Sequence, residues 1–290
     1  MSTLVILHVF SGRPNPTWTL DDNQVAELSE RITGIRRLTT NKPAGSLGHL
    51  GYRGFSVRRE TGSPAGRLGL LIHEGVVDQG QDEPNLLAGN REIEEWLLLT
   101  AGARVPAAVA EHVREDTQRP RTPAMGLQEF EIPQAAGCPK CVAADAPPYS
   151  PSLWNIPSVQ PYNNCYNYAN NQATNTFAQP GRAHGTPATS MSCPGVQPSA
   201  QADGLVPCAN FATPLAKGQG WYVALVIWPG QDYHWYRQDN VGCWSHKPGQ
   251  TAVRNYDNAG KPISDPNTCN RGPYTVFCTY MVTNKSVVIR

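Results

Sequence analysis

Prolines interrupt the middle of this chain so often that no long helix or central strand is expected there. The stretch from Asp116 to Tyr162 contains nine of them, at positions 120, 123, 133, 139, 147, 148, 151, 157 and 161. Proline has no backbone N–H to donate and its ring fixes φ, so such a run favours an extended connection. The sequence therefore predicts two domains, at residues 1–115 and 151–290, joined by a linker at residues 116–150.

The residues before the linker predict a small α+β domain of roughly three or four strands and two or three helices. Residues 3–10 are rich in β-branched and aromatic types, which is typical of a strand. Thr19 and Asp22 have the spacing of a helix cap, and Leu28 and Ile32 follow at helical spacing. Further strands are expected at residues 54–59 and 68–77, and further helices from a cap at Asn90 and from Val105 to about Arg114.

The residues after the linker predict a helix followed by antiparallel strands, again the layout of an α+β domain. The helix is expected from Cys165 to about Ala173, and residues 174–219, rich in Gly, Pro, Ser and Thr, are expected to form loops. The run Trp221–Trp228 is apolar almost throughout and predicts a central strand. A hairpin around Asp239-Asn240 is expected at residues 234–246, with closing strands at 275–282 and 286–289.

The composition argues against some classes of binding partner but does not determine the cellular compartment. The net charge of +1 gives no electrostatic reason to expect a nucleic acid or an anionic membrane as a partner. The run from Met1 to Phe10 lacks the features of a signal peptide and is too short to cross a bilayer. All eight cysteines nevertheless lie after residue 137, and this clustering suggests disulfides and an extracellular setting reached by another route.

Cys165, His234 and His246 form the candidate catalytic group. Cys165 follows two asparagines at the expected start of a helix, and a helix N-terminus beside an imidazolium lowers the pKa of a thiol. His234 would accept and return a proton, and His246, 12 positions later, would orient its ring. An amide from Gln160 or Asn164, with the N–H of Cys165, would form an oxyanion hole. Alternatives for the third catalytic member are Asp232, Asp239 and Asp257.

The segment Asn164-Cys165-Tyr166-Asn167-Tyr168-Ala169 resembles the nucleophile motif of CHAP hydrolases, and the two histidines resemble the Cys-His-His pattern of NlpC/P60 hydrolases. The resemblance covers residues 155–290 and implies a papain-like fold, with a Cys165 helix packed on a small antiparallel sheet. It also implies hydrolysis of amide bonds in a peptide substrate, most often bacterial peptidoglycan, without a cofactor or metal ion. The Asp-Cys-Ser-Gly signature of NlpC/P60 is absent.

A second hypothesis is a non-catalytic structural, self-assembling or carbohydrate-binding protein on a hydrolase-like scaffold stapled by disulfides. Exposed aromatic residues and an unpaired edge strand at residues 3–10 would drive binding or assembly, so that homo-oligomers form through the N-terminal domain. This hypothesis predicts that Cys165 lies in a disulfide.

A third hypothesis concerns the CxxC motif Cys138-Pro139-Lys140-Cys141. Four-ligand zinc sites usually contain two such pairs, and this chain has a single one. A structural disulfide, or two separate bridges, is therefore preferred to a zinc site or a redox pair. The zinc site would combine Cys138 and Cys141 with two of Cys193, Cys208, Cys243 and His184.

Overall fold

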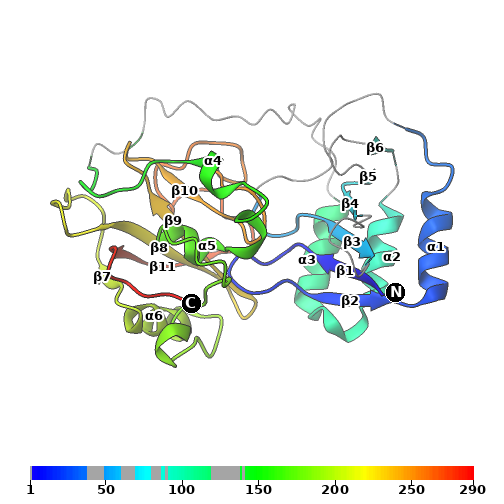
Figure 1. Cartoon of the computed structure of the whole chain (residues 1–290), viewed down its shortest axis with the longest axis horizontal. Coiled ribbons are helices and arrows are strands. Elements are labelled where there is room, and N and C mark those ends of the chain that lie inside the picture. Colours follow the sequence, from blue (N-terminus) through cyan, green and yellow to red (C-terminus); the bar gives the residue numbers. More distant parts are fainter. Residues whose placement is uncertain are drawn as a thin grey trace. The chain divides into compact units, whose positions relative to one another are not determined.

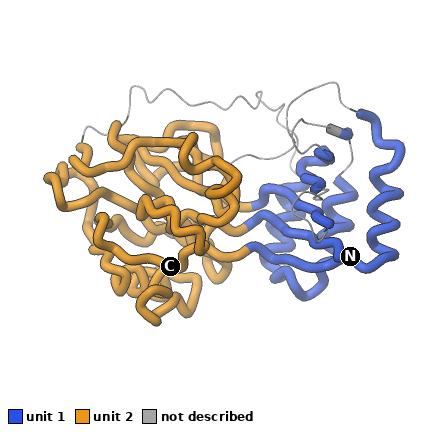
Figure 2. The backbone as a smooth tube through the Cα atoms, in the orientation of Figure 1, with its two compact units in different colours: residues 1–9, 15–47, 52–128 blue, residues 10–14, 48–51, 129–290 orange. Residues whose placement is uncertain are grey.

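The computed structural model describes residues 2–37, 49–59, 69–79, 86–88, 91–118, 138 and 141–290. The chain divides into two compact units (Figure 2). Unit 1 comprises residues 1–9, 15–47 and 52–128, and unit 2 comprises residues 10–14, 48–51 and 129–290. Each unit combines helices with an antiparallel sheet, so the predicted α+β class is confirmed (Figure 1).

Unit 1 is built on a sheet whose described strands lie in the order β2-β1-β3-β4-β5-β6. The strands are β1 (Thr3–Leu7), β2 (Thr17–Leu20), β3 (Phe55–Arg59), β4 (Gly69–His73), β5 (Val76–Asp78) and β6 (Leu86–Leu87). The helices are α1 (Asp22–Ile32), α2 (Glu92–Ala101) and α3 (Ala107–Gln118), with a 3-10 turn η1 (Gly102–Arg104). Val5, Phe55, Ile72 and Leu97 are all fully buried and mark the core of this unit.

Four expectations for this part of the chain are corrected. The cap of α1 is Asp21, whose carboxylate accepts a hydrogen bond from the backbone of Gln24, rather than Thr19. The strand predicted at residues 68–77 is two antiparallel strands, because Glu74 and Gly75 both adopt positive φ and reverse the chain. The predicted edge strand at residues 3–10 is instead β1, which pairs with β2 on one side and β3 on the other. The predicted cap Asn90 lies outside the described residues, and α3 extends into the predicted linker, to Gln118.

Unit 2 contains a second antiparallel sheet, in which the described strands lie in the order β10-β9-β8-β11-β7. The strands are β7 (Val206–Cys208), β8 (Trp221–Trp228), β9 (Asp232–Gln238), β10 (Trp244–His246) and β11 (Val276–Thr283). The helices are α4 (Pro151–Trp154), α5 (Cys165–Ala169) and α6 (Cys193–Ala202), with 3-10 turns η2 (Gln160–Tyr162) and η3 (Arg182–His184). Strand β8 lies between β9 and β11 and all of its residues are buried, as predicted for a central strand.

One face of this second sheet packs against helices α5 and α6. Trp221, Val223 and Leu225 on β8 share a buried cluster with Cys165 and Tyr166 on α5. Valine and alanine residues of α6 join the same cluster, so the two helices cover one face of the sheet (Figure 1). The N-terminus of α5 is thereby brought to strand β9, which carries His234.

Three expectations for the C-terminal part are corrected as well. Residues 174–219 are not all loop, since they contain helix α6, which Ser192 caps by accepting a hydrogen bond from the N–H of Gly195, and strand β7. Helix α5 ends at Ala169 rather than Ala173, because Asn171 takes a positive φ that a right-handed helix cannot continue through. Residues 286–289 form no strand. The hairpin from His234 to His246 is confirmed.

Candidate functional site

Helix α5 places Cys165 at its first position, as the sequence predicted. The side chain of Asn164 accepts hydrogen bonds from the backbone N–H groups of Tyr166 and Asn167, at 3.0 and 3.1 Å. The Asn167 side chain in turn accepts a bond from the Asn164 N–H at 3.1 Å. This reciprocal cap satisfies N–H groups that a helix N-terminus otherwise leaves open, and it fixes where α5 begins.

The environment of Cys165 disfavours a thiolate. The side chain is a free thiol, fully buried beside Tyr166 and Trp235. Burial raises the pKa of the Cys165 thiol well above its ordinary value, and the nearby Asp232 carboxylate raises it further. Hydrogen bonding from the backbone of Trp235 and the charge of Lys247 act in the opposite direction, but more weakly. The lowered pKa expected for a nucleophile is therefore not found.

The structure brings the two predicted histidines together. His234 Nε2 lies 3.0 Å from His246 Nδ1, and His246 Nε2 lies 3.1 Å from the backbone oxygen of Tyr256. A carbonyl only accepts, so His246 donates from Nε2 and, when neutral, accepts the bond from His234 at Nδ1. Both imidazoles are buried, and Tyr236 packs against both rings. The two rings are thus held against each other, and the role of His246 in orienting a catalytic His234 stays a prediction.

Strand geometry separates His234 from the cluster that contains Cys165. Side chains alternate between the two faces along a strand, so His234 leaves β9 on the face opposite to Trp235. Trp235 belongs to the buried cluster of Cys165, whereas the His234 ring contacts Tyr236, His246 and Tyr274. The catalytic roles of Cys165, His234 and His246 stay predictions.

The two residues predicted for an oxyanion hole both donate to backbone carbonyls of the protein itself. Gln160 donates from Nε2 to the oxygen of Gln250 at 3.4 Å. Asn164 donates from Nδ2 to the oxygens of Gly12 and Ala178, at 2.8 and 2.7 Å. Asn164 is therefore a carbonyl-binding residue, and one of the carbonyls it binds comes from residues 10–14.

Asp232 is a site residue whose role the sequence did not reveal. Its buried carboxylate accepts the backbone N–H groups of Ser11 and Gly12 at 2.6 and 3.2 Å, and that of Arg13 at 3.0 Å. The hydroxyl of Tyr274 donates to the same carboxylate at 2.6 Å. Burial outweighs these bonds and raises the pKa of Asp232. The sequence predicted only a turn at Ser11-Gly12-Arg13, because nothing local connects it to a residue some 220 positions away.

The backbone carbonyl of Gly12 also accepts hydrogen bonds from side chains of unit 2. Among the described residues, Asn164 Nδ2 and Gln179 Nε2 donate to this oxygen at 2.8 Å each, and the Tyr233 hydroxyl donates at 3.2 Å. Residues 10–14, here called the docked segment, are thus held through both the donors and the acceptors of their backbone.

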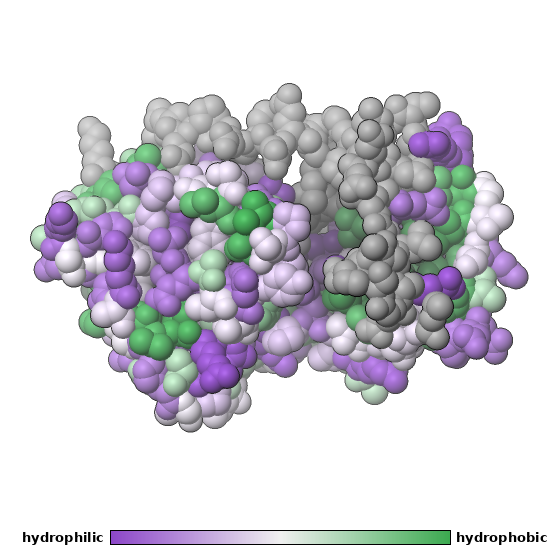
Figure 3. Space-filling view, viewed as in Figure 1, coloured by the Kyte–Doolittle hydropathy of each residue, from purple (hydrophilic) through white to green (hydrophobic). Residues whose placement is uncertain are grey.

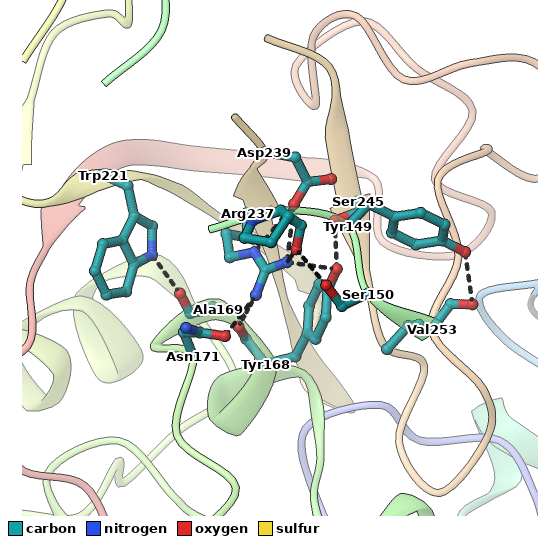
Figure 4. A network of polar contacts seen from close by, with 11 residues as sticks. Tyr149, Ser150, Tyr168, Ala169, Asn171, Trp221, Arg237, Asp239, Ser245 and Val253 are labelled. Carbon is teal, nitrogen blue, oxygen red and sulfur yellow. Dashed lines mark hydrogen bonds and ion pairs between the residues drawn. The ribbon is translucent and has the colours of Figure 1, made fainter. Parts of the chain in front are cut away.

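Arg237 is the centre of a buried polar network that joins α5 to β9 and β10 (Figure 4). Its Nη2 donates to the Tyr168 hydroxyl at 2.8 Å, and its guanidinium lies over the Tyr168 ring, 4.0 Å from the ring centroid. That hydroxyl lies 2.6 Å from the Ser245 hydroxyl on β10. Asn171 accepts a further bond from Nη1 of Arg237 at 3.1 Å. The network joins helix and hairpin mainly through the buried side chains of Arg237, Tyr168 and Ser245.

The cysteines are divided between disulfides and free thiols. Cys138 is bonded to Cys243, and Cys193 to Cys278. The bridged cysteines include three of those named for a zinc site, which is therefore excluded in the form predicted. Of the two cysteines in the CxxC motif, Cys138 lies in a structural disulfide and Cys141 is a free thiol, so the expected bridging is confirmed for Cys138 alone. Cys141, Cys165, Cys208 and Cys269 are free, so the prediction of a bridged Cys165 is wrong.

The tryptophans of unit 2 do not provide the exposed aromatic surface that was predicted for binding. Trp221, Trp228, Trp235 and Trp244 are all buried, because they pack on the two faces of the sheet. On the face of the molecule shown in Figure 3, hydrophobic residues form separate small patches between polar ones. In the described part of the chain, no helix is long and apolar enough to cross a membrane.

Fold and site together define an α+β protein with a disulfide-stapled second unit and a buried, protonated cysteine. Its sequence is 49% identical over 133 residues to "Insoluble matrix shell protein 1" of Ruditapes philippinarum. The match covers 46% of this chain and 87% of that protein, so the chain belongs to the family of this matrix shell protein. No family model and no solved structure matches the chain.

This relationship corrects the function expected from the sequence. A cysteine-dependent amide hydrolase acting on peptides or peptidoglycan was predicted from the order Cys165, His234, His246, whereas the relative is a protein of an insoluble shell matrix. The order of three residue types along a chain does not distinguish a hydrolase from a protein with another role, and the relative is what overturns the prediction. Similarity to NlpC/P60 and CHAP hydrolases stays a prediction about the scaffold.

Proposed function

We propose that this protein is a non-catalytic structural component of an insoluble extracellular matrix, built on a hydrolase-like scaffold stapled by disulfides. The observation that carries the proposal is the 49% identity to a matrix shell protein across 87% of that protein's length. Two proteins this similar over most of one of them share a fold, and a structural role is the simplest function they have in common.

The two disulfides support an extracellular setting. They join residues 105 and 85 positions apart, so each closes a large loop of unit 2. Such bridges persist in oxidising compartments and are rare in the cytosol. A protein that remains for long periods in a matrix also benefits from the constraint that a bridge places on its unfolded chain.

The state of Cys165 supports a structural use of the scaffold. A thiol that is fully buried and protonated is a poor nucleophile, and the side-chain amide next to it, that of Asn164, is already bound to Gly12 and Ala178. Helix α5 packed on an antiparallel sheet is the arrangement expected of a papain-like scaffold. We propose that the scaffold is retained and that its pocket is filled by the protein's own residues.

The proposal is tested by locating the protein in the organism that makes it. An antibody raised against the full chain is used on extracellular material extracted first with buffer, then with denaturant, and finally with denaturant plus reductant. The protein is expected in the residue that buffer leaves behind, with a cytosolic enzyme as the negative control. Recovery of the protein only from the soluble cell lysate would reject a matrix role.

A further inference from the structure

The docked segment has the features of a bound peptide. Its N–H groups at Ser11, Gly12 and Arg13 converge on the Asp232 carboxylate, and its Gly12 carbonyl receives donors from Asn164, Gln179 and Tyr233. A cluster of groups that binds both polarities of one short backbone stretch is how proteins recognise extended peptides. The receptor residues all lie beyond residue 160, whereas the segment comes from the first fifteen residues.

The receptor also selects side chains of the segment. The Gly12 Cα lies against the ring of Tyr233, and a Cβ at this position would fall 2.3 Å from a ring carbon. Phe10 packs edge-on against Trp228, with ring centroids 6.1 Å apart. Arg13 donates from Nη1 to the oxygen of Gln231 at 2.5 Å. The site therefore fits an aromatic residue, a glycine and an arginine in this order.

A second segment of the N-terminal region is held in unit 2 in a similar way. The N–H of Leu50 donates to the side-chain oxygen of Asn258 at 2.8 Å, and Asn258 Nδ2 donates to the Leu50 oxygen at 2.9 Å. Residues 10–14 and 48–51 both belong to unit 2, while the chain on either side of them belongs to unit 1 (Figure 2). Residues 1–128 thus contain two segments that bind to residues in the C-terminal part of the chain.

We propose that the receptor formed by Asn164, Gln179, Asp232 and Tyr233 also takes the docked segment of a second copy of this chain, and that this exchange links copies into the matrix. The inference rests on the proposed structural function and names the contact through which the protein would assemble. The occupant is a second copy because the receptor is already complementary to this chain's own Phe10, Gly12 and Arg13.

Exchange of an identical element needs no new contacts, since every hydrogen bond of the closed form is made again between copies. The linker predicted from the sequence at residues 116–150, of which α3 takes the first three residues, connects the donor part of each copy to its receptor part. Each copy offers a donor segment and a receptor on different parts of its chain. Such a head-to-tail contact produces rings or open filaments, and open filaments account for insolubility.

Complementary variants of the full chain test the proposal. Gly12→Ala gives a segment that cannot dock and leaves the receptor intact, whereas Asp232→Ala damages the receptor and leaves the segment intact. Wild-type protein is expected to gain mass with concentration in analytical ultracentrifugation, and each variant alone to remain monomeric. An equimolar mixture of the two variants is expected to form a heterodimer, because the intact segment of one fits the intact receptor of the other. Gly69→Ala is the matched control, since no atom of the described residues lies within 4 Å of the Cβ it adds, and it should assemble like wild type.

A synthetic peptide spanning residues 9–17 provides a test that needs no variant to fold. Added in excess to wild-type protein, it is expected to shorten the assemblies by occupying receptors, while a peptide with Gly12→Ala is expected to have no effect. Binding of the peptide to the Gly12→Ala protein should be about tenfold or more stronger than to the Gly12→Ala/Asp232→Ala protein. Assembly that neither peptide nor variants alter would overturn the exchange and leave the matrix role intact. Absence from extracellular extracts would instead reject the matrix role, whatever the peptide does.

Discussion

Arg237 and Asp239 form a fully buried ion pair in which Nε and Nη2 of the arginine lie 3.1 and 2.9 Å from the same carboxylate oxygen. Breaking such a pair leaves an uncompensated charge in the interior. We expect Arg237→Met to lower the free energy of unfolding by about 3–5 kcal/mol, measured by urea denaturation. The double variant Arg237→Met/Asp239→Leu should lose less free energy of unfolding than Arg237→Met, since neither buried charge remains.

The exposed pair Arg31–Glu27 is the control for this prediction. Its atoms lie 2.7 Å apart, but the two side chains are 34% and 46% exposed, so solvent screens the charges. Arg31→Met should therefore change the free energy of unfolding by no more than about 0.5 kcal/mol. If Arg31→Met and Arg237→Met lowered the free energy of unfolding equally, burial would not determine how much the loss of an ion pair destabilises the protein.

The disulfide between Cys193 and Cys278 should be a major source of stability for unit 2. It closes a loop of 85 residues, and in the chain-entropy account a bridge of this length stabilises by roughly 4.5 kcal/mol. Cys193→Ser/Cys278→Ser is expected to unfold at a clearly lower urea concentration than wild type. Cys141→Ser, at a free and half-buried thiol, is the control and should unfold as wild type does. Peptide mapping without reduction checks the pairing, and a fragment linking Cys278 to any other cysteine would contradict it.

Local sequence patterns predicted those elements whose cause is local. Trp221–Trp228 was expected as a central strand because it is apolar almost throughout, and the structure shows it with these bounds. The start of a helix at Cys165 followed from the asparagines before it, and Asn164 is its cap. In both cases neighbouring residues determine the structure, through burial or through a cap.

Helix α6 begins at a local start signal within a stretch whose composition is typical of loops. Glycine, proline and serine made residues 174–219 look like loop, yet Ser192 followed by Pro194 is a start signal for a helix. Proline is tolerated there because the first N–H groups of a helix have no partner within it. The start of this helix therefore has a local cause, in the capping serine and the proline that follows it.

The contacts that define the site could not be predicted from patterns along the chain. The bond between Ser11 N–H and the Asp232 carboxylate spans 221 positions, and no periodicity links two such residues. The alternation of β9, which directs Trp235 toward Cys165 and His234 away from it, depends on which face of the sheet the helices cover. Eight cysteines also permit far more pairings than sequence can choose between.

The burial of Cys165 predicts slow alkylation in the folded protein. Iodoacetamide attacks the thiolate, and burial both raises the pKa of this thiol and keeps the reagent out. Between about pH 4 and pH 9, peptide mapping of the native protein should show label on Cys141, a half-buried cysteine, before Cys165. In denaturant, Cys141 and Cys165 should be alkylated at similar rates. Fast labelling of Cys165 in the native protein would contradict its burial.

His8 predicts that unit 1 loses stability in acid. It is buried on unit 1, with Nε2 2.6 Å from the Ser56 hydroxyl, and burial together with the charges of Arg53 and Arg58 lowers its pKa from 6.5 to about 3. Between these two values the unfolded chain binds a proton at His8 and the folded protein does not, so the free energy of unfolding rises with pH.

The stability that neutral His8 contributes is therefore complete above about pH 6.5 and is lost as the pH falls toward the folded value, by up to about 1.4 kcal/mol per pH unit. Urea denaturation monitored at Trp18 or Trp96 of unit 1 measures this slope. His8→Gln and His8→Phe cannot take up the proton, so both should flatten the acid side of the profile, whatever they cost at neutral pH. If both variants kept the wild-type dependence of the free energy of unfolding on pH, groups other than His8 would cause the acid sensitivity.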